Sequence, residues 1–296
     1  MTKRKTVVTI GICVRNGERT ILNALKSLNA QKFPKDLLEI IIVDDGSTDN
    51  TLEIVRSFAE NSDIQVKIYT QGWKGIASAR NLVIREVKGK YIIWVDADMM
   101  LPEDYVIKLV EFMELHPNVG ATRGQYGIIK SKKLVAMLEN CRTINLWSPL
   151  PRLWGTGGAI YRVSALKEIG GFDERIKGAG EDIDVLIRLQ KKGWVICSLD
   201  VKFYEHYKET WGELWKQYFW WGYGAHFISH KHENFINVIS RLPIVAFIAG
   251  ILRLLKIFKY ESRLIYLLLP IHEVFKKTSW LMGFIIGHFD GYGHKA

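Results

Sequence analysis

The stretch YIIWVDAD, residues 91–98, decides the fold prediction. Five apolar residues run directly into two carboxylates, Asp96 and Asp98, and Gly89 stands just before them. An apolar run that is β-branched and aromatic is typical of a strand buried on both faces of a sheet. Where that strand emerges, two like charges repel each other unless a cation lies between them. The pattern favours a hard divalent ion that bridges to substrate phosphates; the alternative is that Asp96 caps the next helix and Asp98 is solvated.

Strand and helix patterns alternate before this stretch. Strands are predicted over 6–14, 39–43 and 66–70, and helices over 20–28, 51–58 and 76–87. This alternation predicts an α/β fold with a mostly parallel sheet and helices on both faces. Ligands of such sheets bind beyond the carboxyl ends of the strands. Three polar loops follow strands there: Arg15–Gly17, Asp44–Ser47 and Asp96–Asp98.

The composition narrows the class of partner. The formal charge is +10, which suits nucleic acid, anionic lipid or phosphorylated small molecules. No run of Lys and Arg with interleaved aromatics is present, so nucleic acid is disfavoured as a partner. The glycine motifs of dinucleotide and P-loop sites are also absent. We therefore expect the loops to hold a nucleotide through carboxylates, with a metal ion on its phosphates.

Two glycine-rich segments mark the second half of the chain. Gly157 and Gly158 lead into a predicted strand, where glycines serve either a tight turn or close approach of the backbone to a ligand. The segment Gly178–Asp184 brings three carboxylates to the start of a helix at 185–191. The helix dipole alone explains such carboxylates. The two preceding glycines would also let this loop approach a substrate.

Three motifs in order resemble family 2 glycosyltransferases of the GT-A fold. They are DDGSTD at 44–49, G-x-x-x-A-R-N at 75–81 and D-x-D at 96–98, and the resemblance spans residues 6–224. It implies an inverting transferase that uses a nucleotide-diphosphate sugar and Mn²⁺ or Mg²⁺. It also implies a donor site in which Asp45, with Asp44, contacts the base and ribose. Arg80 would lie near the diphosphate, Asp96 near the ribose and metal, and Asp98 would be the principal metal ligand.

The resemblance assigns three further residues. Asp182 would be the catalytic base that takes the proton from the acceptor hydroxyl, and Glu181 would bind or orient the acceptor. His206 would be a third metal ligand. Each role has a plainer alternative: a turn and helix cap for Asp44 and Asp45, a helix-surface charge for Arg80, and a partly buried histidine for His206.

An aromatic segment departs from a related pattern. Processive synthases that resemble this family carry Gln-x-x-Arg-Trp, whereas residues 217–221 place Trp220 where that arginine stands. Transfer of a single sugar is therefore expected. Trp220 either stacks on a sugar or packs in a core. The predicted substrate-binding residues are Arg15, Asp44, Asp45, Arg80, Asp96, Gly157, Gly158 and Trp220.

The composition shifts after the predicted catalytic domain, residues 1–233. Residues 234–296 hold apolar runs that charged residues interrupt, and none gives the roughly 20 apolar residues of a spanning helix. Basic residues outnumber acidic ones here, so we expect amphipathic helices on the anionic, cytoplasmic face of a membrane. The alternative is a helical subdomain packed on the catalytic domain or on a second copy of the chain. Three scattered cysteines suit a reducing compartment.

The sequence thus predicts a glycosyltransferase that acts on a glycan or a lipid-linked acceptor, through either a hydroxyl or a phosphate. Two alternatives stay open. One is a nucleotidyltransferase on a similar sheet, although Arg15–Gly17 is a poor phosphate loop. The other is a non-catalytic nucleotide-sugar binder or membrane scaffold, against which Asp98 and Asp182 both speak.

Overall fold

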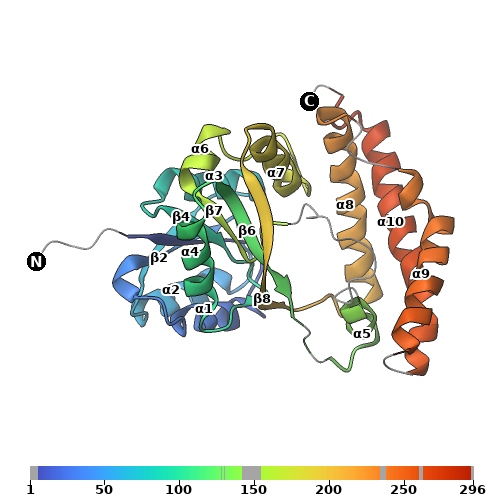
Figure 1. Cartoon of the computed structure of the whole chain (residues 1–296), viewed down its shortest axis with the longest axis horizontal. Helices are drawn as coiled ribbons and strands as arrows, with labels where there is room; N and C mark the ends of the chain where they lie inside the picture. The colour runs from blue at the N-terminus through green and yellow to red at the C-terminus, as the bar shows by residue number, and fades with distance from the viewer. Residues whose placement is uncertain are drawn as a thin grey trace, which may run out of the picture. The chain divides into compact units, whose positions relative to one another are not determined.

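The computed structural model describes residues 6–127, 129, 131–141, 155–233, 238–259 and 263–294 (Figure 1). This part of the chain forms two compact units. The first, the sheet unit, contains residues 6–127, 155–174 and 181–206. The second, the helical unit, contains residues 129, 131–141, 175–180, 207–233, 238–259 and 263–294.

The sheet unit is built on an eight-stranded sheet with the order β3-β2-β1-β4-β7-β6-β8-β5. Its strands are β1 (Val8–Val14), β2 (Leu38–Asp44), β3 (Gln65–Thr70), β4 (Tyr91–Trp94), β5 (Met99–Met100), β6 (Val119–Tyr126), β7 (Ala159–Arg162) and β8 (Val195–Glu205). The strands β3, β2, β1 and β4 are parallel. Antiparallel pairing begins at β7, which lies between β4 and β6. The α/β prediction is confirmed, and the sheet is mixed beyond β4.

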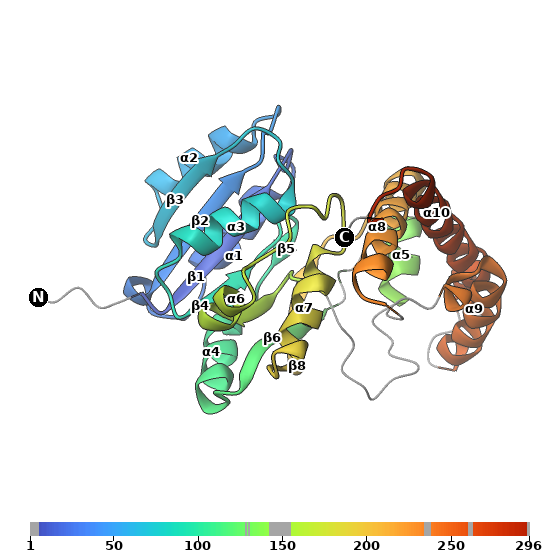
Figure 2. The same cartoon turned by 90° about the horizontal axis from the view of Figure 1, so that it is seen from above.

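Helices cover both faces of this sheet. One face packs on α1 (Ile21–Asn29), α2 (Thr51–Glu60) and α4 (Tyr105–Leu115). The other face packs on α3 (Ile76–Glu86), α6 (Val163–Glu168) and α7 (Glu181–Lys191). Figure 2 shows the sheet between helices of these two groups.

The strand β4 contributes side chains to the cores on both faces of the sheet. Its four residues are all buried, and successive side chains point to opposite faces. Tyr91 and Ile93 join the core with α1 and α4, whereas Ile92 and Trp94 join the core with α3 and α6. Burial ends just after Val95, so the carboxylates of Asp96 and Asp98 begin where the apolar run stops.

Three long helices form the helical unit: α8 (Trp211–Lys231), α9 (Pro243–Phe258) and α10 (Leu269–Phe289). They lie side by side in Figures 1 and 2. Thr210 and Glu213 form a capping box that starts α8. Gly222 of α8 faces the backbone of Trp280, so any side chain there would collide with α10. No helix in the described part of the chain has the length and apolar content that crossing a membrane requires.

A buried ionic network fixes the short helix α5 (Leu134–Asn140) to α10. Glu139 accepts hydrogen bonds from His272 Nε2 at 2.8 Å and from Lys276 Nζ at 3.0 Å. Lys276 also contacts Glu273, which pairs with Arg253 of α9. Glu139, His272, Glu273 and Lys276 are buried, so their polar groups pair with one another in place of water.

The grouping of α8 bears on the predicted domain boundary. The sequence analysis placed that boundary after residue 233, whereas contacts group α8 with α9 and α10. The reason is the close approach of α8 and α10 at Gly222 and Gly283. Gly222 and Gly283 lie far apart in the sequence, so their positions alone do not predict that α8 packs on α10.

Candidate functional site

Two of the polar loops at the carboxyl end of the sheet are joined by hydrogen bonds. Asn16 is held at a φ of 54° and donates its backbone N–H to Ser47 Oγ at 2.9 Å. Its side-chain oxygen accepts the backbone N–H of Thr48 at 2.8 Å. Arg15 donates to the carbonyl of Gly46 at 3.4 Å. The loops after β1 and β2 therefore form one surface, as their positions in the sequence predict.

The two carboxylates that follow β2 have different surroundings. Both oxygens of Asp45 accept hydrogen bonds: the backbone N–H of Lys74 lies 2.9 Å from Oδ1 and that of Gly75 lies 2.9 Å from Oδ2. Asp44 Oδ2 accepts the backbone N–H of Ser47 at 3.2 Å, whereas its buried Oδ1 has no hydrogen-bond partner. Asp45 thus fixes the loop before α3, and Asp44 has an oxygen left for a ligand.

Trp73 is a candidate that the sequence analysis missed. Its side chain is 72% exposed, and the guanidinium of Arg15 lies 4.3 Å from the ring centroid. Trp73 belongs to the loop that Asp45 fixes, and its backbone nitrogen lies close to Gly46 of the joined loops. A flat, exposed ring suits stacking on a nucleotide base. An exposed tryptophan in a loop after a strand is the signal that could have found it.

The strands β5 and β8 bring His206 to Asp98. Met99 pairs with Glu205 in the antiparallel ladder, and the backbone N–H of His206 donates to the carbonyl of Asp98 at 3.1 Å. Residues 108 positions apart in the chain are therefore neighbours. This adjacency is the one that the predicted third metal ligand requires.

Gly157 and Gly158 close the other side of Asp96. A Cβ at Gly157 would lie 2.6 Å from Asp96 Oδ2, so only glycine lets the loop pass this carboxylate. Gly158 has a φ of 72°, a backbone conformation that favours glycine. Its N–H donates to the carbonyl of Trp94 at 2.8 Å. The glycine pair therefore serves both a turn and a close approach to Asp96.

The donor set of Asp96, Asp98 and His206 suits Mn²⁺ or Mg²⁺ in its chemistry, with two carboxylates and one imidazole. The adjacency of Asp98 and His206 agrees with this use. Their side-chain ligand atoms, together with those of Asp96, do not gather within 4.8 Å of one another in this structure. Side-chain rotation would have to bring them onto an ion.

Arg80 connects the sheet edge to the second predicted carboxylate pair. Its Nη1 lies 2.5 Å from Glu181 Oε1, and its Nη2 lies 3.9 Å from Asp96 Oδ1. Arg80 is buried on α3, and its guanidinium lies 5.3 Å from the ring centroid of Phe172. The alternative of a helix-surface charge is therefore wrong. The structure adds an ion pair with Glu181 that the sequence analysis did not expect.

Asp182 lies beside this ion pair, at the first turn of α7. Burial and the adjacent charge of Glu181 raise the pKa of Asp182 to about 7, although Arg80 acts in the opposite direction. Asp182 Oδ2 is 3.1 Å from where a Cβ of Gly155 would stand, so the glycine loop also passes this carboxylate. A carboxylate with a pKa near 7 can accept a proton and release it again at neutral pH.

Trp220 lies in the other unit. It belongs to α8, its side chain is 49% exposed, and its ring meets Tyr223 edge to face at 5.5 Å. Among the predicted residues, the structure therefore groups Arg15 with Asp44 and Asp45, and Asp96 with Arg80, Glu181 and Gly157.

Comparison with known proteins places the chain in a family. Residues 9–170 match the family described as Glycosyl transferase family 2, and residues 91–289 match the Glycosyl transferase family group 2. The chain is 31% identical over 239 residues to the probable glycosyltransferase YdaM of Bacillus subtilis. It is 27% identical over 226 residues to the poly-beta-1,6-N-acetyl-D-glucosamine synthase of Staphylococcus epidermidis.

These alignments cover 76% and 71% of this chain, and 56% and 52% of the two relatives. The chain therefore spans about half the length of the curated relatives it matches. A solved structure, the mannosyltransferase PcManGT of Pyrobaculum calidifontis in complex with GDP-Man and Mn²⁺, has a TM-score of 0.65 at 19% identity. That likeness covers 97% of this chain and 87% of the other, and it supports the fold. The chain belongs to glycosyl transferase family 2, a family of transferase enzymes.

Proposed function

We propose that this protein transfers one sugar, with inversion at the anomeric carbon, from a nucleotide-diphosphate sugar to a hydroxyl or phosphate of a glycan or lipid-linked acceptor. One observation carries the proposal. Arg80 contacts Asp96, next to Asp98 at the sheet edge, and Glu181, next to Asp182 at the start of α7. The donor carboxylates and the proton-accepting carboxylate therefore belong to one cluster of charges.

The donor nucleotide would lie on the joined loops after β1, β2 and β3. Asp44 Oδ1 is buried without a hydrogen-bond partner, and such an atom costs stability unless a ligand satisfies it. A donor group on the base or ribose would supply that hydrogen bond. The ring of Trp73 would stack on the base, and Arg15 stiffens that ring from the other side.

Mn²⁺ or Mg²⁺ is the proposed cofactor. Asp96, Asp98 and His206 would hold the ion, which when bound would neutralise charge on the departing diphosphate. The mannosyltransferase with GDP-Man and Mn²⁺ is a precedent in the same fold. Measuring transferase activity with each metal in turn would identify the ion.

Glu181 and Asp182 would have different roles in the reaction with the acceptor. Asp182 takes the proton of the acceptor hydroxyl while its oxygen bonds to the anomeric carbon. The bond from that carbon to the diphosphate breaks on the opposite face, and its electron pair stays on the diphosphate oxygen. Glu181 pairs with Arg80 through Oε1, so it would not take the proton, and its Oε2, which has no hydrogen-bond partner, would bind or orient the acceptor.

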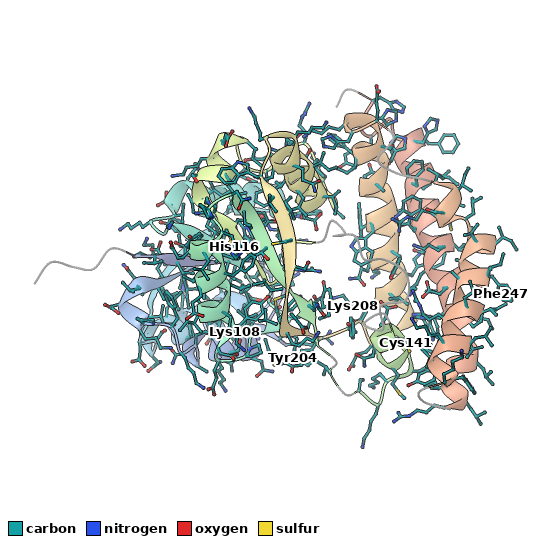
Figure 3. The ribbon with its side chains drawn as sticks, viewed as in Figure 1. Lys108, His116, Cys141, Tyr204, Lys208 and Phe247 are labelled. Carbon is teal, nitrogen blue, oxygen red and sulfur yellow. The ribbon has the colours of Figure 1, made fainter. Side chains whose placement is uncertain are left out.

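An apolar surface of the helical unit supports a membrane acceptor. Residues of α9 that repeat every three or four positions are exposed, and Figure 3 shows Phe247 among them at the outer edge of the helix. The exposed large apolar residues of α9 and α10 are Ile244, Val245, Phe247, Ile248, Ile251, Leu252, Leu255, Ile271, Met282, Ile285, Ile286 and Phe289. Lys259 and Arg263 add positive charge. Such a surface suits the headgroup layer of an anionic, cytoplasmic leaflet.

Vesicle binding tests the membrane part. The protein is expected to sediment with anionic vesicles, and the pair Ile248→Glu and Leu255→Glu is expected to keep it in the supernatant. Trp73→Glu, which also changes an exposed apolar residue, serves as the matched control. Equal sedimentation of all three proteins would reject the membrane proposal.

Thermal shift tests the donor site. Nucleoside diphosphates are screened with and without Mn²⁺ on wild type and Asp98→Ala, because ligands that bind the folded state raise its stability. A metal-dependent shift with one nucleotide, lost in Asp98→Ala, is expected. No shift with any nucleotide would contradict the donor site.

The released product separates the enzyme classes. A sugar transferase releases a nucleoside diphosphate from its donor, whereas a nucleotidyltransferase releases pyrophosphate in its forward direction. The proposed activity predicts nucleoside diphosphate and an acceptor longer by one sugar. A ladder of longer products would show processive synthesis. Binding of the nucleotide sugar without formation of any product would favour a non-catalytic binder.

A further inference from the structure

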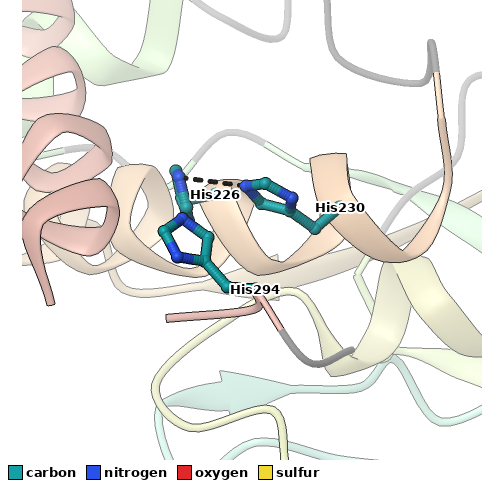
Figure 4. Close-up of side chains that lie close together, drawn as sticks. All are labelled: His226, His230 and His294. Atoms are coloured by element: carbon teal, nitrogen blue, oxygen red, sulfur yellow. Dashed lines mark hydrogen bonds between the residues drawn. The ribbon is translucent and has the colours of Figure 1, made fainter. Parts of the chain in front are cut away.

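Four histidines of the helical unit cluster at the end of the described chain. His226 and His230 lie one turn apart on α8, His288 lies in the last turn of α10, and His294 lies beyond it. Figure 4 shows the rings of His226, His230 and His294 turned towards one another. Their ligand nitrogens all lie within 4.8 Å of one another. The donor site proposed above uses none of these residues.

The C-terminal turn of α10 creates this cluster. Tyr292 donates its N–H to the carbonyl of Gly287 and Gly291 donates to that of His288, which is a Schellman motif. Gly291 has a φ of 64°, which the motif requires at that position. The turn reverses the chain, so that the ring of Tyr292 stacks on Tyr223 of α8 at 4.5 Å. His294 is delivered to His230 by this reversal, with ring centroids 4.9 Å apart.

The proton on His226 can be located from its surroundings. His226 Nδ1 lies 2.5 Å from the carbonyl oxygen of Tyr292. A carbonyl only accepts, so Nδ1 carries the hydrogen and Nε2 of the neutral ring has a bare lone pair.

Two other nitrogens face that lone pair. His230 Nε2 and His288 Nδ1 each lie 3.3 Å from His226 Nε2. Nitrogens about 2.0–2.1 Å from a tetrahedral zinc ion stand about 3.3–3.4 Å apart, so these separations match the edge of a tetrahedral site. The hydrogen bond from His226 Nδ1 to a backbone carbonyl is the outer contact that orients histidine ligands of metals.

We propose that His226, His230 and His294 bind a zinc ion, with His288 or a water molecule in the fourth position. Imidazole nitrogens suit Zn²⁺ and related transition metals, whereas Mg²⁺ prefers oxygen. His226 is buried and forms the floor of the site, and the other three rings are exposed, so an ion reaches them from solvent.

The ion would also order a segment that matters to the transferase. The hydroxyl of Tyr292 accepts the N–H of Lys177 and donates to its carbonyl at 2.8 Å. Residues 178–180 then lead directly into Glu181. Zinc that fixes the turn at Tyr292 would therefore restrain the stretch of chain just before the carboxylate pair.

Titration of the full-length, tag-free protein with Zn²⁺ and Co²⁺ tests the site. We expect one ion per chain, visible absorption typical of tetrahedral Co²⁺, and at least about tenfold weaker binding for His230→Ala and for His294→Ala. Both residues are exposed, so these variants keep the buried His226 and its hydrogen bond to the carbonyl of Tyr292. His116→Ala, an exposed histidine of the sheet unit, is the matched control and should bind as wild type.

A second arm separates this site from the donor site. Asp98→Ala should keep its zinc, and hydrogen exchange of residues 175–180 and 288–294 should slow when zinc is added. Binding that is unchanged in a His230→Ala, His294→Ala double variant would overturn the proposal. Binding that is absent in wild type, or lost in Asp98→Ala, would overturn it as well.

Discussion

Two pairs of adjacent carboxylates, Asp44–Asp45 and Glu181–Asp182, lie in the sheet unit and are stabilised in different ways. Asp45 accepts backbone N–H groups on both oxygens, whereas Glu181 pairs with the guanidinium of Arg80 through Oε1 and its buried Oε2 has no hydrogen-bond partner. Asp44 and Asp182 are the other members of the two pairs. Asp44 keeps an oxygen without a partner, and the pKa of Asp182 is raised to about 7. In each pair, one carboxylate is anchored to a neighbouring segment, by N–H groups for Asp45 and by Arg80 for Glu181, and the other is the candidate for ligand binding or proton transfer.

The largest expected effect is at Asp182. Asp182→Asn removes the base and should lower the turnover number by about 10²–10⁴-fold. Because the folded-state pKa is raised, the ionised form costs stability at high pH, and that cost is absent below the unfolded pKa. The variant should therefore be at least as stable as wild type at pH 8. Product release and melting temperature check both parts, with the exposed Asp200→Asn as control.

Arg80 is the test of the ion pair. Arg80→Met leaves Glu181 buried without its cation and should reduce the free energy of unfolding by about 3 kcal/mol or more. Adding Glu181→Gln should restore part of that loss, because the buried charge is then removed as well. A double-mutant cycle by urea denaturation measures the coupling. Additive losses would show that the pair does not hold α3 to α7.

The pH profile sharpens the role of Glu181. The value of kcat/KM should rise with pH through about 7 as Asp182 loses its proton. Glu181→Gln removes the neighbouring negative charge that raises the pKa of Asp182, so the midpoint should move to lower pH. A midpoint that stays in place would assign the titration to another group.

The smallest effects separate Asp44 from Asp45. Asp45→Asn replaces one carboxylate oxygen with an NH₂ group that cannot accept a hydrogen bond from Lys74 or Gly75. This change should lower the free energy of unfolding by about 1–3 kcal/mol. Asp44→Asn keeps an oxygen that can accept the N–H of Ser47, so it should cost less stability than Asp45→Asn and should weaken nucleotide binding. Thermal melts with and without nucleotide give both values. The reverse order of stabilities would refute the division of labour in this pair.

Much of the sheet could be predicted from local pattern. The apolar run of β4 predicts a buried strand, and the carboxylates after it predict a polar edge of the sheet. The structure agrees, because the buried residues end at Val95, just before Asp96. The insertion of β7 between β4 and β6 could not be predicted, since a strand of four residues carries no information on its neighbours in a sheet. The polar loops could be placed at one edge, because parallel strands end together.

The site was harder to predict where contacts join distant residues. Arg80 sits in an ordinary helix pattern, and its partner Glu181 lies 101 positions away. The histidine cluster depends on a left-handed glycine, Gly291, which turns the chain back on itself. Single-residue patterns cannot report such long-range pairs.

The most direct test of the account is the pKa of Asp182 itself. Carbon-13 labelling of the aspartate carboxyls and NMR titration follow each group, and comparison with Asp182→Asn identifies the resonance. We predict one carboxyl with a midpoint near pH 7 that is missing in the variant. A resonance for Asp182 that titrates near pH 4, as an ordinary exposed aspartate does, would contradict the account.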